Sequence, residues 1–168
     1  PHCAKNCFGL REAYRIMSIV VQTATECAEL PDHSSLTQWV ALATQQNKDA
    51  EVLLRLVDEA ESTELNQTYR QKKGPTNVLS FPFERPLDLP EEALSNNVLG
   101  DLVICAPVVL EEASQQGKKL LAHWAHMVIH GCLHLQGYDH INQDDAEVME
   151  ALEIELLKSI GISNPYES

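Results

Sequence analysis

The sequence predicts a single α+β domain in which a small mixed β-sheet of about four strands packs with about five helices. Its 168 residues are enough to bury a core, and 44% of them are hydrophobic while 22% are charged, as in ordinary globular proteins. Strand-like and helix-like patterns follow one another in the order β-α-β-α-β-β-α-α-α. Neither a repeat nor a low-complexity segment divides the chain.

The first half of the chain predicts two strands and two helices. An apolar run at 19–23 indicates the first strand, and Ser34 or Ser35 can cap the helix that follows. The buried face of that helix has the i, i+3, i+4, i+7 spacing: Leu36, Trp39, Val40 and Ala43. A strand with alternating apolar residues ends near Asp58. A second helix runs from Glu59 to about Lys73, where Gly74-Pro75 stops it.

The second half predicts two more strands and three helices. Strands at 76–81 and 98–105 flank a loop at 84–97, which is rich in proline and charge. Pro107 opens a helix that continues to about Gln116. A longer helix covers 120–135, and the last helix starts at Asp144 or Asp145 and ends at Gly161. We expect the carboxylates of this last helix, Glu153 among them, to form its solvated face.

Composition limits the function and the compartment. The formal charge of −13 argues against a surface that binds nucleic acid everywhere, although a local positive site can exist on an acidic protein. Five irregularly spaced cysteines indicate a reducing, cytoplasmic compartment. No apolar run is long enough for a membrane span. Residues 1–16 look unlike the rest, and we expect a non-native or disordered leader before a single domain at 17–168.

Five of the seven histidines lie between His123 and His140, and three of these have the spacing of a metal site. His130 and His134 are four residues apart, so on a helix they share one face. Gly137 allows the helix to end in a left-handed turn, after which His140 can return to the same point. Three neutral imidazoles with an open fourth position are typical of catalytic zinc. The sequence therefore predicts one zinc ion per chain at the end of a central helix.

His126 lies near the same helix face but does not fit the same ion. It is eight residues before His134, about 12 Å along the helix axis, whereas zinc–nitrogen bonds are only about 2.0–2.1 Å. We therefore assign His126 either to the residues that support the metal ligands or to the substrate-binding wall. Asp139, beside His140, orients a ligand imidazole, accepts a proton, or is simply a turn residue.

The histidine spacing is also that of the metzincin peptidases. Those enzymes have a glutamate directly after the first histidine as the general base. Here that position is Gly131, so a standard zinc-peptidase mechanism lacks its base. Another zinc-dependent hydrolase remains an alternative.

Arg70, Lys72 and Lys73 form the densest basic patch in a chain with only 12 basic residues. An arginine near a metal can bind a phosphodiester through two hydrogen bonds. The same cations would also complement the dipole at a helix C-terminus. Composition alone favours this second, structural interpretation.

Four ordered blocks resemble the YbeY family of bacterial metal-dependent endoribonucleases. The blocks are LNQTYR at 65–70, PTNVLSFP at 75–82, LGDL at 99–102 and HGCLHLQGYDH at 130–140. The resemblance covers about Met17 to Tyr166. It implies His130, His134 and His140 as zinc ligands and Arg70 as a functional arginine. Arg70 and His130 thereby become the predicted catalytic residues, and we place Lys72 and Lys73, from the same basic patch, beside the substrate.

The resemblance also implies a biological role. We expect a single-strand-specific endoribonuclease that acts in ribosomal RNA maturation, including the 3′ end of the 16S RNA, and in ribosome quality control. Its expected partners are ribosomal RNA and proteins of the small ribosomal subunit, with neither DNA nor a membrane. A non-enzymatic ribosome-assembly factor with structural zinc is a further alternative.

Overall fold

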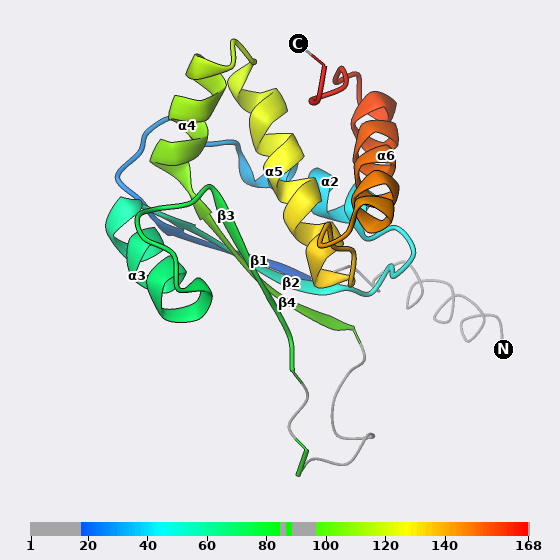
Figure 1. Ribbon diagram of the computed structural model, residues 1–168, viewed down its shortest axis with the longest axis horizontal. Helices are drawn as coiled ribbons and strands as arrows, with labels where there is room; N and C mark the ends of the chain where they lie inside the picture. The colour runs from blue at the N-terminus through cyan, green and yellow to red at the C-terminus, as the bar shows by residue number, and fades with distance from the viewer. Residues whose placement is uncertain (1–17, 85–86, 89–96, 168) are drawn as a thin grey trace, which may run out of the picture.

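A four-stranded mixed sheet with the order β1-β2-β4-β3 forms the centre of the structure (Figure 1). Strands β1 (Ser18–Ala24), β2 (Glu51–Val57) and β4 (Val98–Cys105) are parallel. Strand β3 (Val78–Pro82) pairs antiparallel with β4 and forms one edge. The β3 edge is the part of the sheet nearest to the candidate site.

This computed structural model describes residues 18–84, 87–88 and 97–167. Over these ranges it contains four strands and five helices, which confirms the predicted α+β domain with a small mixed sheet. The predicted leader at 1–16 and most of the predicted loop at 84–97 lie outside the described residues. None of the helices in the described ranges combines the length and the apolar composition that a membrane crossing requires.

Helices cover both faces of the sheet. The helices are α2 (His33–Ala43), α3 (Glu59–Arg70), α4 (Ala106–Gln115), α5 (Leu120–Leu135) and α6 (Gln143–Ser159). The main core lies between one sheet face and α2, α5 and α6, with Leu54, Leu102 and Trp124 fully buried in it. A smaller cluster on the other face, around Val103, packs against Leu65 of α3. The sheet alternates faces residue by residue, so Leu102 and Val103 serve different cores.

Helix α3 ends at Arg70, so the predicted end near Lys73 is wrong by about one turn. Gln71 adopts φ 53°, a left-handed conformation that turns the chain before Gly74-Pro75 is reached. Side chains of α3 then hold the returning segment: the Asn66 amide donates to the carbonyl of Gly74 at 2.9 Å. The chain then runs to β3, which begins at Val78.

The capping residues of two other helices also differ from the predictions. Asp32, and neither Ser34 nor Ser35, caps α2 by accepting a hydrogen bond from the Ser35 amide at 2.7 Å. Asn142 caps α6 by accepting from the Asp145 amide at 2.8 Å, so the helix starts at Gln143. In both cases an Asp or Asn just upstream supplies a cap oxygen that the apolar periodicity does not reveal.

Asp58 links the start of α3 to the segment after β1 and should make stability depend on pH. Its carboxylate accepts hydrogen bonds from the Thr25 hydroxyl and from the Glu26 amide, at 3.1 Å for the latter. These bonds, that from Thr25 first, lower the pKa of Asp58 below its ordinary value of 3.8. The stabilisation is therefore complete above about pH 4 and is lost as the pH falls through the lowered pKa.

We expect Asp58→Asn to lower the Tm of the protein by a constant amount from about pH 7 to about pH 5. Below about pH 4 the difference from the parent should shrink, because the parent then loses the charge that the variant lacks. Thermal unfolding across this range checks it, with the exposed Glu64→Gln on the same helix as the control. A Tm difference that stayed constant down to pH 3 would contradict the assignment.

Candidate metal centre

Three histidine rings meet at the C-terminal end of α5. His130 and His134 lie one turn apart on the helix, and Gly137, at φ 98°, makes the left-handed turn that returns His140 to them. The ring centroids are 4.6 Å apart for His130 and His134, 4.8 Å for His134 and His140, and 5.1 Å for His130 and His140. One ring nitrogen from each lies within 4.8 Å of the others, so the three can hold a metal ion.

The donor set fits a zinc-like ion. The Nε2 atoms of His130 and His134 are 3.1 Å apart. Two nitrogens bound tetrahedrally at about 2.0–2.1 Å would be separated by roughly 3.3 Å, close to this spacing. Burial, followed by the nearby rings of His130 and His140, lowers the pKa of His134. A lowered pKa keeps the imidazole neutral, which is the form that binds metal.

Glu153 of α6 is a site residue that the sequence interpretation missed. We expected it on the solvated face of the last helix, but its side chain is fully buried. It lies four residues after Met149 and three before Leu156, both of which are buried. This helical spacing was the available signal. The structure shows why a carboxylate occupies the position: it faces two histidines of α5.

Hydrogen bonds from three side chains keep Glu153 ionised inside the protein. His130 Nδ1 lies 2.6 Å from one carboxylate oxygen, and His126 Nε2 lies 2.8 Å from the other, which also accepts from the Tyr166 hydroxyl. Burial alone would raise the pKa of Glu153, but these hydrogen bonds outweigh it and lower the pKa to about 2. A negative charge therefore lies directly behind His130, one of the three predicted ligands.

The contacts of Asp139 and His126 bear on the alternatives that the sequence left open for them. The Asp139 carboxylate accepts from the backbone amide of His140 at 2.8 Å, which is the contact of a turn residue, and no imidazole bond from it is found among the described residues. His126 is buried and bonded to Glu153. It lines a separate cavity of 450 Å³ that also reaches His130 and His140.

Arg70 shares a cavity of 540 Å³ with the three histidines. Its Nη2 donates to the carbonyl of Ser80 on β3 at 3.1 Å, and the Ser80 hydroxyl donates to the carbonyl of Gly131 on α5 at 3.2 Å. These two bonds join α3, β3 and α5, which lie side by side in Figure 1. Lys72 also lines the cavity, whereas Lys73 is exposed and is not part of its lining. The rest of the lining is mainly polar and includes Asn66, Asn77 and Tyr138.

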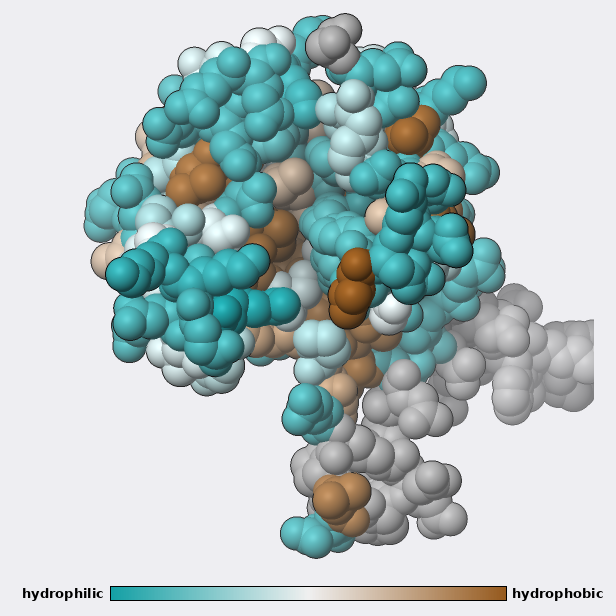
Figure 2. Space-filling model, viewed as in Figure 1, coloured by the Kyte–Doolittle hydropathy of each residue, from teal (hydrophilic) through white to brown (hydrophobic). Residues whose placement is uncertain are grey.

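The surface view is consistent with this arrangement. Figure 2 shows a hollow between the parts of the surface formed by α3 and by α5, with hydrophobic colour at its floor and hydrophilic residues on both sides. The hollow is therefore open to solvent on this face.

Gly131 packs closely against the sheet beneath α5. A Cβ atom at this position would lie 2.8 Å from Leu102 Cδ2 and 3.2 Å from Val78 Cγ2. The metzincin glutamate is thus excluded by the sheet beneath the helix as well as being absent from the sequence. A carboxylate base at this position would require a different packing of α5 on β3 and β4.

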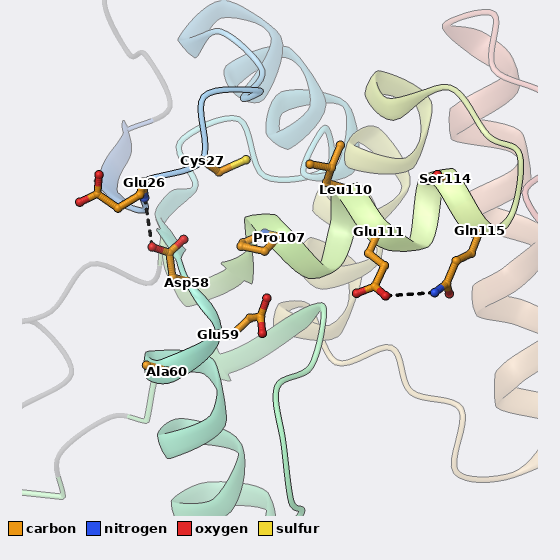
Figure 3. A pocket seen from close by; sticks show the side chains of 10 residues that line it. All are labelled: Glu26, Cys27, Asp58, Glu59, Ala60, Pro107, Leu110, Glu111, Ser114 and Gln115. Atoms are coloured by element: carbon orange, nitrogen blue, oxygen red, sulfur yellow. Dashed lines mark hydrogen bonds between the residues drawn. The ribbon is translucent and has the colours of Figure 1, made fainter.

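A larger cavity of 840 Å³ lies elsewhere, between the segment after β1, the start of α3 and helix α4 (Figure 3). Four carboxylates line it: Glu26, Asp58, Glu59 and Glu111. Its described lining contains neither histidine nor a basic residue, and such a rim would repel an anionic ligand. Cavity size therefore does not locate the candidate site, whereas the side-chain chemistry does.

The chain is similar to proteins of one known family. The family described as endoribonuclease YbeY matches residues 19–161. A relative from Pseudomonas putida, named endoribonuclease YbeY, is 57% identical over 152 residues, which cover 90% of this chain and 94% of the relative. A relative of the same name from Methylococcus capsulatus is 53% identical over 151 residues, which cover 90% of this chain and 96% of the relative.

A solved structure is also similar. It is the solution structure of a Thermotoga maritima protein, 27% identical, with a TM-score of 0.49 and coverage of 89% of this chain and 100% of that one.

The family match covers residues from β1 to the end of α6, and this range includes all three clustered histidines and Arg70. The chain therefore belongs to the endoribonuclease YbeY family.

Proposed function

We propose that this protein is a zinc-dependent endoribonuclease that cleaves single-stranded RNA in the maturation of ribosomal RNA. One observation carries the proposal: three imidazoles converge on a cavity that also contains Arg70, in a chain whose relatives are named endoribonucleases. We extend the proposal to the 3′ end of the 16S RNA, to ribosome quality control, and to small-subunit proteins as partners in the cytoplasm.

The side chains have distinct parts in this activity. A zinc ion bound by His130, His134 and His140 would supply Lewis-acid chemistry for hydrolysis of a phosphodiester. Three neutral ligands leave the charge of the site positive, which attracts an anionic backbone. Arg70 uses one guanidinium nitrogen on the Ser80 carbonyl, and this bond fixes its plane at the cavity wall. Its other N–H groups can then bind a phosphate oxygen, beside the ammonium group of Lys72.

Cleavage of a labelled RNA tests the proposal. One strand is offered alone and as a duplex, together with a DNA strand of the same sequence. We expect the zinc-loaded parent to cut only the single-stranded RNA, and His130→Ala to cut none of the substrates. A parent free of contaminating nucleases that cut no RNA would overturn the proposal. So would cleavage that His130→Ala and Arg70→Ala left at the parental rate.

Arg70→Ala should lower kcat/KM for RNA by roughly 100- to 1,000-fold, as expected for loss of a donor to the developing charge. Arg70→Lys should recover only part of this, because an ammonium group offers a point charge without the planar fork. Single-turnover cleavage at saturating zinc measures both. The exposed Lys48→Ala serves as a charge-matched control with parental rates, and full activity of Arg70→Ala would exclude a role at the phosphate.

A further inference from the structure

We propose that Glu153 is a positioning residue for His130, holding the imidazole in the tautomer and orientation that present Nε2 to the metal. This inference rests on the proposed function, since it needs zinc at the three histidines. It assigns a role to a residue of α6, a helix that contributes none of the three ligands.

The contact between Glu153 and His130 determines where the imidazole proton resides. The 2.6 Å between His130 Nδ1 and Glu153 Oε1 is a hydrogen-bond distance, and a carboxylate at the far nitrogen of a ligand histidine accepts its N–H. Nδ1 must therefore carry the proton, which leaves Nε2 with a lone pair. Nε2 is the atom that lies 3.1 Å from His134 Nε2, on the side of the ring that faces the cluster.

Glu153 is itself held from its other side. Its second oxygen accepts from His126 Nε2 at 2.8 Å and from the Tyr166 hydroxyl. The Glu153 side chain is fully buried and that of His130 is 18% exposed, so the pair is largely shielded from water. The carboxylate therefore has a fixed position, and its hydrogen bond fixes the orientation of the His130 ring. This gives the buried His126 a function without any contact with the zinc ion.

The same atoms do not have the spacing of a second metal site. His126, His130 and Glu153 offer three ligand atoms close together. However, two ligand atoms bound tetrahedrally at about 2.0–2.2 Å lie roughly 3.3 Å apart. The 2.6 Å between Glu153 and His130 is too short for that arrangement and fits a direct hydrogen bond. Carboxylates that bond to the far nitrogen of a ligand histidine are a common means of orienting it.

The test measures zinc affinity by chelator competition and the His130 tautomer by ¹⁵N chemical shifts in the metal-free protein. We expect Glu153→Gln to weaken zinc binding about 10-fold and Glu153→Ala about 100-fold, the range for residues that support a ligand. The ¹⁵N shifts of the parent should report a proton on Nδ1, and those of Glu153→Ala a mixture of tautomers. Tyr166→Phe, which removes one donor to Glu153, should have a smaller effect than Glu153→Gln.

Met149→Ala is the matched control for a structural effect. Met149 is fully buried on the same helix, one turn before Glu153, so this variant should lower the Tm without changing zinc affinity or the tautomer. Two results would overturn this inference and leave the proposed metal site unaffected. One is Glu153 variants that bind zinc like the parent, and the other is a parent that binds two zinc ions per chain. A parent that bound no zinc would overturn the proposed metal site as well. Failure to cleave RNA with zinc still bound would count only against the proposed activity.

Discussion

Replacing His134 with alanine is expected to abolish stoichiometric zinc binding and RNA cleavage together. Its Nε2 is 3.1 Å from that of His130, and its ring lies against that of His140, so the remaining two ligands cannot enclose an ion. Structural zinc sites with four ligands gain about 10–16 kcal/mol in total, so one ligand accounts for roughly 3–4 kcal/mol. That corresponds to a loss of zinc affinity of several hundred-fold.

Metal analysis after dialysis, combined with single-turnover cleavage, measures this effect. The control is His33→Ala, because His33 is an exposed histidine on α2 that contacts only Thr37 among the described hydrogen-bond partners. The control should keep one zinc ion per chain and the parental rate. If His134→Ala retained one tightly bound zinc ion, the ligands would have to be other residues.

Introducing the missing glutamate, as Gly131→Glu, should destabilise the protein by more than about 3 kcal/mol and should not create peptidase activity. The new Cβ would lie 2.8 Å from a methyl group of Leu102, a residue that is fully buried beneath α5. Overpacking of this kind costs roughly 1–3 kcal/mol, and a carboxylate pressed into the same space adds the cost of its desolvation. Chemical denaturation of the metal-free variant measures the change.

Gly131→Ala separates the cost of overpacking by the Cβ atom from the cost of desolvating the carboxylate. It adds only the Cβ atom, and alanine gains about 1 kcal/mol of helix propensity over glycine, so its stability should stay within about 1 kcal/mol of the parent. A Gly131→Glu variant as stable as the parent would show that α5 can move away from β3 and β4. In that case the lack of a carboxylate base would be a matter of sequence alone.

Arg70 illustrates how much of the candidate site the local sequence could predict. A basic run after a helix is most simply explained by the helix dipole, and only the family resemblance pointed to a phosphate. The structure adds that Gln71 turns the chain one residue later and that the Ser80 carbonyl holds the guanidinium. These features bring Arg70 and Lys72 to the histidines, across a separation of 60 residues between Arg70 and His130.

Local patterns by themselves determined the fold class, most of its elements and the meeting of His130, His134 and His140. Helix periodicity and one glycine turn act over a few residues, so these features are encoded where they occur. Only the tertiary structure decided the other half of the site. The burial of Glu153, its bonds to His126 and His130, and the steric closure of Gly131 depend on how α6 and the sheet pack against α5. Such contacts join residues far apart in the chain. The spacing of Glu153 from Met149 and Leu156 could indicate its burial, but no local pattern specifies its partners.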